Sequence, residues 1–241
     1  DLIVSRGLGD VYKRQISPSF SVSRLSLIDR GMVYAIAHIR GGMEKGKKWY
    51  EDGKKKNKLN SFKDFIACAE FLKKENISEN ITIHGGSAGG LLIGASINIS
   101  PDTFHCAVAE VPFVDVLNTI LDDTLPLTPP EWEEWGNPIK SKSDFDYIGS
   151  YSPYDNIREQ NYPTILATSG LTDPRVTYWE ATKWIAKLRS KKTNDNPVFL
   201  KTYTDAGHGG MAGRYNQIKE TAFIYAFILW RNNLIKRPFS S

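Results

Sequence analysis

The stretch Ile81-Thr-Ile-His-Gly-Gly-Ser-Ala-Gly-Gly90 decides the fold. A short β-rich run leads into Gly85-x-Ser87-x-Gly89, and the apolar, small-residue stretch 91–100 follows until Pro101 ends it. Glycines permit a sharp turn between a strand and a helix, and such a turn lifts a serine hydroxyl clear of the sheet. The minimal motif is common by chance, but the strand before it and the helix after it favour a reactive serine at position 87.

Short apolar runs alternate with amphipathic stretches on both sides of this turn. Residues 31–40 are almost continuously apolar, which predicts a strand buried on both faces, and Ser61-Phe-Lys-Asp64 has the spacing of a capping box. The alternation predicts an α/β fold, with a mostly parallel sheet and helices on both faces. We expect strands at 31–40, 81–84, 107–111, 164–168 and 198–203, and helices at 61–75, 91–100, 177–189 and 217–234.

Length and composition narrow the class of protein. The chain has 241 residues, 41% of them hydrophobic, and its net charge of +4 is too small to indicate a nucleic-acid partner. Cys68 and Cys106 show neither a disulfide framework nor zinc-ligand spacing, so we expect buried thiols in a reduced, cytoplasmic protein. The longest apolar run, residues 222–230, is too short to span a bilayer and predicts a core helix, not a membrane anchor.

The first fifteen residues differ in character from the rest. Residues 10–15 resemble one reading frame of a transposase adaptor used in sequencing libraries, and residues 1–9 lack a hydrophobic period. We expect residues 1–15 to be a non-native segment that contributes nothing to the fold, and residues 16–241 to form the folded domain. The chain does not begin with Met, so we expect it to be part of a longer protein.

A serine nucleophile needs a base that takes its proton, and the chain holds four histidines. His38 lies within a predicted buried strand, His84 precedes the serine within its strand, and His105 follows the first helix. We expect structural roles for these three. His208 lies on a glycine loop directly after the last predicted strand, which is the position of the base in α/β-hydrolases.

The base in turn needs a carboxylate that orients it. Asp173 follows the fourth predicted strand, so the order serine, aspartate, histidine is that of the α/β-hydrolases. Asp205 is a rival, but it lies only three residues before His208 on the same loop, where we expect it to cap a turn. The backbone amide of Ala88, next to the serine, is the expected donor to the oxyanion. This chemistry requires neither a metal ion nor an organic cofactor, and we expect none.

The excursion between the third and fourth predicted strands, residues 112–162, is Pro-rich, aromatic and acidic. Such excursions cross the end of the sheet where substrates bind. Within it, Glu131, Glu133 and Glu134 are interleaved with two tryptophans. One interpretation is a solvated acidic loop. The other is a pocket whose carboxylates receive a substrate Lys or Arg while aromatic faces cover its aliphatic stem.

From about residue 16 to residue 239 the chain resembles the catalytic domain of the prolyl oligopeptidase family of serine peptidases. Within that family it is most similar to the oligopeptidase B branch, which cuts after basic residues. The resemblance rests on the motifs at 23–27, 38–42, 49–53, 85–90, 111–116, 133–138, 151–155, 170–173 and 207–210.

The resemblance implies an α/β-hydrolase fold and an endopeptidase that cuts short peptides after Lys or Arg through an acyl-enzyme. It implies that Glu131 and Glu133 bind the basic side chain and that Arg175 holds a substrate carbonyl. The roles implied for the remaining site residues are nucleophile for Ser87, general base and acid for His208, orienting carboxylate for Asp173 and oxyanion donor for Ala88.

Three departures from the family pattern affect these expectations. The family's N-terminal β-propeller, which admits only short peptides, is not in this sequence, so a longer protein would have to supply it. The family strand and the Tyr-Gly-x-Tyr-Gly turn before residue 16, with a tyrosine oxyanion donor, are also missing, and Tyr12 is no substitute. We therefore expect the sheet to lack an interior strand and the chain alone to fold poorly. Ser17 and Ser19 stand where the branch has acidic residues for a second basic side chain.

Two other functions stay open at this point. An esterase or an acylaminoacyl-type hydrolase would share the same three residues but have a different pocket. A non-catalytic binding domain with a decayed site would belong to another class, and labelling of Ser87 by a fluorophosphonate would exclude it.

Overall fold

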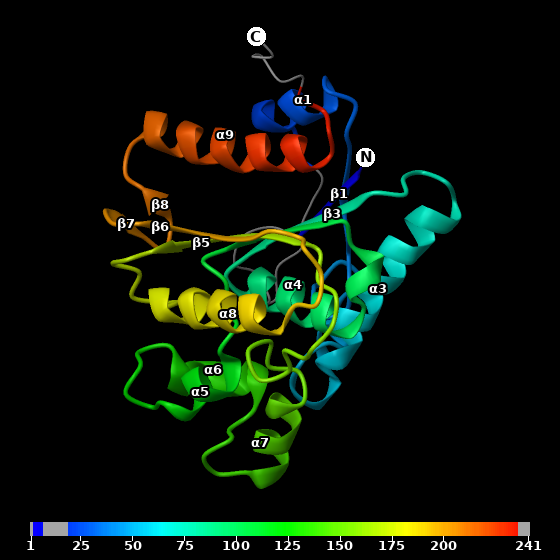
Figure 1. Cartoon of the computed structure of the whole chain (residues 1–241). Helices are drawn as coiled ribbons and strands as arrows, with labels where there is room; N and C mark the ends of the chain where they lie inside the picture. The colour runs from blue at the N-terminus through cyan, green and yellow to red at the C-terminus, as the bar shows by residue number, and fades with distance from the viewer. Residues whose placement is uncertain (1, 7–18, 236–241) are drawn as a thin grey trace.

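A computed structural model describes residues 2–6 and 19–235 and is built around one parallel sheet (Figure 1). Six strands lie in the order β2-β1-β3-β4-β5-β6, and every neighbouring pair is parallel. The predicted parallel sheet is confirmed. The strands are β1 Leu2–Arg6, β2 Val33–Ile36, β3 Ile81–Gly86, β4 Cys106–Glu110, β5 Thr164–Gly170 and β6 Val198–Tyr203, and β7 Ala206–Gly207 and β8 Gly210–Met211 form a separate antiparallel pair.

Helices cover both faces of the sheet, as predicted. Figure 1 shows α1 and α9 on one face and α3, α4 and α8 on the other, with α5, α6 and α7 beyond this second layer. The α-helices are α1 Val22–Ile28, α2 Lys47–Glu51, α3 Leu59–Lys74, α4 Ala88–Ile99, α5 Val116–Leu121, α6 Thr128–Trp135, α7 Lys142–Gly149, α8 Tyr178–Lys191 and α9 Arg214–Arg231, and the 3₁₀ helices are η1 Lys55–Asn57 and η2 Pro101–Thr103.

Side chains of the central strands alternate between two hydrophobic clusters. On β4, Ala107 packs into the larger cluster with the helices α3, α4 and α8, whereas Cys106 and Val108 pack into the smaller one beneath α9. All seven residues of β5 are buried. A strand covered by helices on both faces is apolar over most of its length, which is why these runs could be recognised in the sequence. Cys106 is buried and Cys68 half-buried, and neither is in a disulfide.

The sheet contains an interior strand that the sequence was expected to lack. Residues 2–6 form β1, which pairs with β2 on one side and with β3 on the other. The expectation that residues 1–15 contribute nothing to the fold is therefore wrong for residues 2–6. Poor folding was expected because the sheet would lack this strand, and that reason no longer holds, because β1 joins β2 to β3. Residues 7–15, including Tyr12, and Ser17 lie outside the described residues.

The strand predicted at 31–40 is shorter and less buried than expected. Only Val33–Ile36 form β2, which is an edge strand, and Val33 is 47% exposed. His38 lies beyond the strand and is exposed, so its placement within a buried strand is wrong. An unbroken apolar run does not distinguish an interior strand from an edge strand that continues into a buried loop.

The capping box predicted at Ser61 is also wrong, because α3 begins at Leu59. The Ser61 hydroxyl donates instead to the carbonyl oxygen of Arg40, at 2.6 Å. The Asp64 carboxylate accepts from the Arg40 backbone N–H at 3.0 Å and from its Nε at 2.8 Å. These polar residues therefore fasten the helix to the segment after β2 instead of capping it.

The excursion at 112–162 contains the helices α5, α6 and α7, which the sequence did not predict. They have six to eight residues each, too few for a clear helical period. Among the described residues, no helix combines the length and the apolar character that crossing a membrane requires.

Candidate active site

Ser87 lies at the sharp turn between β3 and α4, as the motif predicts. Its backbone has φ 54° and ψ −122°, a conformation that a residue with a Cβ rarely adopts. Two hydrogen bonds hold the turn: the Ser87 N–H donates to the Glu110 carbonyl oxygen at 2.8 Å, and the Phe113 N–H donates to the Ser87 carbonyl oxygen at 3.0 Å. Strain of this kind persists where surrounding contacts fix it, and it is typical of functional sites.

Glycines on either side of Ser87 allow the backbone to pack closely. A Cβ on Gly85 would lie 2.6 Å from the carbonyl oxygen of Gly89, and a Cβ on Gly90 would lie 2.4 Å from the Cβ of Pro112. Both separations are shorter than any van der Waals contact, so a larger residue would push the turn apart.

His208 is hydrogen-bonded to Asp173, the carboxylate that the order along the chain predicts. The His208 Nδ1 lies 2.8 Å from Asp173 Oδ2, and Asp173 Oδ1 accepts from the backbone N–H groups of Arg175 at 2.8 Å and Val176 at 3.1 Å. Burial alone would raise the pKa of Asp173, but these hydrogen bonds outweigh it and lower the pKa below its ordinary value. Asp205 is exposed on the turn before His208.

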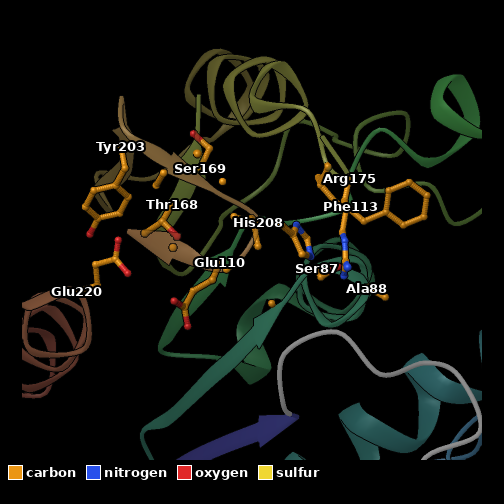
Figure 2. Close-up of a pocket in the computed structure, with 18 of the residues that line it drawn as sticks. Ser87, Ala88, Glu110, Phe113, Thr168, Ser169, Arg175, Tyr203, His208 and Glu220 are labelled. Atoms are coloured by element: carbon orange, nitrogen blue, oxygen red, sulfur yellow. The ribbon is translucent and has the colours of Figure 1, made fainter. Parts of the chain in front are cut away.

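Ser87, His208 and Arg175 line one cavity of about 1020 Å³ at the carboxyl edge of the sheet. In Figure 2 the imidazole of His208 lies beside Ser87, and the side chain of Arg175 extends toward both. Ser87 makes no hydrogen bond to His208 in the described structure, and such contacts are often loose before substrate binds. The cavity therefore brings together three groups that lie far apart in the chain.

The residue after Ser87 supplies a backbone donor. Ala88 is the first residue of α4 and lines the cavity. The N–H groups of a helix's first turn have no acceptor within the helix, and the positive end of the helix dipole lies there. The Ala88 amide is therefore available to an oxygen that becomes negatively charged beside Ser87.

Of the three glutamates on α6, Glu131 lines the cavity. It is half-buried, and its Oε2 accepts a hydrogen bond of 2.8 Å from the Trp135 indole. Trp135 packs in turn against Phe113, with ring centroids 5.5 Å apart. Glu131 thus lines the cavity with a carboxylate, as the second interpretation of the acidic stretch expects, whereas the Trp135 indole beside it is only 1% exposed.

The other two glutamates lie outside the lining of the cavity. The Glu133 side chain is 87% exposed, and its carboxylate forms an ion pair of 3.0 Å with Lys55. Glu134 is buried and accepts a hydrogen bond of 2.6 Å from the Tyr50 hydroxyl, with Lys58 Nζ 3.6 Å away. The structure therefore separates the three carboxylates into a cavity group, a surface group and a core group.

Glu110, a further acidic residue of the cavity wall in addition to Glu131, was not predicted from the sequence. His84 Nε2 lies 2.5 Å from Glu110 Oε1, and both residues line the cavity, although His84 was expected to have only a structural role in the sheet. Glu110 is the last residue of β4, and such positions at the carboxyl edge of a parallel sheet often face the site. His105 lies elsewhere, 3.1 Å from the Arg231 carbonyl oxygen.

A parallel sheet that carries a strained serine between a strand and a helix, with a histidine on the loop after its last strand, defines the α/β-hydrolase fold. The sequence model described as "Prolyl oligopeptidase family" matches residues 18–233. The chain belongs to the prolyl oligopeptidase family, as its resemblance predicts.

Individual relatives agree with this assignment. The chain is 48% identical to dipeptidyl aminopeptidase BI of Pseudoxanthomonas mexicana over 90% of its own length and 30% of the relative's. It is 49% identical to protease 2 of Moraxella lacunata, over 90% of the chain and 32% of the relative. The structure of oligopeptidase B from Leishmania major matches with a TM-score of 0.93 and 46% identity, over 98% of the chain and 33% of the solved one. The chain thus spans about a third of the length of these relatives.

Proposed function

We propose that this chain is the catalytic region of a serine endopeptidase that hydrolyses short peptides after Lys or Arg. One observation carries the proposal: the hydrogen-bonded pair of His208 and Asp173 opens onto the same cavity as the strained Ser87 and the carboxylate of Glu131. The first three groups support acyl transfer, and the fourth supports recognition of a cation.

In this mechanism His208 takes the proton of the Ser87 hydroxyl as the oxygen attacks the scissile carbonyl carbon. Asp173 keeps the imidazole in the tautomer that accepts at Nε2 and stabilises the imidazolium that forms. The Ala88 amide donates to the carbonyl oxygen as it gains negative charge. The imidazolium then protonates the leaving amine, which leaves an acyl-enzyme on Ser87. His208 next activates a water molecule, which releases the peptide acid and restores the serine.

Specificity in this proposal depends on Glu131. Its half-buried carboxylate offers a charge-assisted hydrogen bond to a guanidinium or an ammonium, and the buried indole of Trp135 holds that carboxylate in place. Arg175 is exposed at the cavity and can donate to a backbone carbonyl of the peptide. Glu133, predicted as a partner of Glu131, is paired with Lys55, so the proposal assigns the basic side chain to Glu131 alone.

Peptide cleavage by the full-length gene product tests this function. A mixture of synthetic decapeptides, each with one Arg, Lys, Pro or Leu at its centre, is digested, and the cleavage products are identified by mass spectrometry. We expect cuts after Arg and Lys and no cleavage by Ser87→Ala. Hydrolysis of short acyl esters with no peptide cleavage would refute the proposal and favour the esterase. The absence of both activities would favour a non-catalytic domain.

A further inference from the structure

Glu180, on α8, is a carboxylate with no exposed surface that the proposed mechanism does not use. A buried charge is costly unless hydrogen bonds satisfy it. Its Oε2 accepts from the backbone N–H groups of Val114 and Asp115, both at 2.9 Å, and its Oε1 accepts from the Thr119 hydroxyl at 2.8 Å. All three donors belong to the segment that leaves β4 and enters α5.

This segment is strained where it begins. Val111, directly after β4, has φ 39°, which is rare for a β-branched residue. The next residues cross the first turn of α4, and there the Phe113 N–H bonds to the Ser87 carbonyl oxygen. A strained turn keeps its shape only when its surroundings fix it. Glu180 holds the C-terminal end of this segment, because it accepts hydrogen bonds from the N–H groups of Val114 and Asp115 just before α5 begins.

From α5 the contacts continue into α6, the helix that carries Glu131. The Thr128 hydroxyl donates to the Thr119 carbonyl oxygen at 2.8 Å, and the Trp132 indole donates to the Ile120 carbonyl oxygen at 3.2 Å. The two short helices are therefore joined by side-chain hydrogen bonds. Neither has enough residues to be stable by itself, so their placement depends on such contacts.

We propose that Glu180 is a positioning residue for substrate specificity, because it fixes α5, and through α5 the helix α6, so that Glu131 faces the cavity. The inference rests on the function proposed above. Glu180 touches no substrate. It acts on the reaction through Glu131, so its removal affects recognition of a basic side chain more than the chemistry at Ser87.

The test compares three variants of the full-length gene product. Glu180→Met keeps the length of the side chain and removes the acceptor, whereas Glu180→Gln keeps an acceptor without the charge. Glu159→Gln is the matched control, because Glu159 lies on the surface with its side chain 71% exposed. The measurements are kcat/KM for an arginyl arylamide and its norleucyl analogue, the rate of Ser87 labelling by an uncharged fluorophosphonate, and hydrogen exchange of residues 114–135.

We expect Glu180→Met to lower the arginyl-to-norleucyl ratio at least tenfold, with faster exchange in α5 and α6 and a labelling rate within about threefold of wild type. Glu180→Gln should restore most of the ratio, and Glu159→Gln should change nothing. If Glu180→Met does not fold, Thr119→Val, which removes one of the three donors, should lower the ratio about threefold.

Folded variants that keep the wild-type ratio would overturn the role of Glu180, even if they melt at lower temperature. A wild-type protein that labels at Ser87 but does not prefer arginine would instead overturn the proposed specificity. The two failures are thus distinguished by the wild-type measurement alone.

Discussion

Glu131→Gln removes one negative charge from the cavity while keeping the side chain's length and an oxygen that can accept from Trp135. Two unit charges about 4 Å apart attract by roughly 4 kcal/mol at an effective dielectric constant of about 20. Both groups lose water when they meet, and Glu131 is only half-buried, so we expect about 1.5–2 kcal/mol of this attraction to remain. That corresponds to a fall of about 10- to 30-fold in kcat/KM for an arginyl substrate.

The assay measures kcat/KM for arginyl and norleucyl arylamides of equal length. The loss should appear with the arginyl substrate alone, because the norleucyl side chain carries no charge for Glu131 to bind. Glu133→Gln is the matched control: it makes the same change two residues away, on an exposed carboxylate paired with Lys55, and should cost less than twofold. A larger loss from Glu133→Gln than from Glu131→Gln would refute the assignment of the basic side chain.

Three further changes test other parts of the account. Asp173→Asn should lower kcat by about 10⁴ without unfolding the chain, because the amide favours the wrong tautomer of His208. Steady-state kinetics measures kcat and circular dichroism checks that the variant is folded. A fall in kcat of less than about tenfold would contradict the role of Asp173. Gly90→Ala should lower the free energy of unfolding by about 1–3 kcal/mol, since its Cβ would meet Pro112; an unchanged urea midpoint would exclude that reasoning. Burial raises the pKa of Glu180 from its ordinary 4.5 to about 7, so the folded chain keeps a proton that the unfolded chain releases, and this contribution to stability is lost as pH rises through that window. Relative to wild type, Glu180→Gln should therefore gain up to about 3 kcal/mol of unfolding free energy between roughly pH 4.5 and 7, and parallel pH profiles would disprove the assignment.

The central strands and the turn at Ser87 could be predicted because their signals are local. Residues 81–90 contain the strand, the glycines and the start of the helix in one short stretch, and β3, β4 and β5 lie inside the sheet with almost all of their residues buried. The order of Ser87, Asp173 and His208 along the chain was enough to select one aspartate and one histidine, because parallel strands place the loops that follow them at the same edge.

The errors came from contacts between distant segments. Ser61 and Asp64 have the spacing of a capping box, yet both bind Arg40, which follows a strand at the far edge of the sheet. β1 was excluded because residues 1–9 lack a hydrophobic period and residues 10–15 resemble an adaptor, whereas its place between β2 and β3 depends on pairing with strands that come later in the chain. Local pattern carries no information on such partners.

The three glutamates of α6 show, within one helix, that contacts with distant residues cannot be predicted from local pattern. Their spacing alone could not show which carboxylate faces the cavity. Glu133 and Glu134 form ion pairs with Lys55 and Lys58, which lie more than 70 residues earlier in the chain, and the sequence does not indicate these partners. Helical geometry sends successive side chains in different directions, so only Glu131 lines the cavity.

Labelling by a fluorophosphonate tests most directly whether Ser87 is a nucleophile activated by His208. After exposure of the full-length protein to the probe, peptide mass analysis should find the adduct on Ser87, and His208→Ala should slow its formation at least 100-fold. An unmodified Ser87, or an adduct that forms equally fast without His208, would contradict the account.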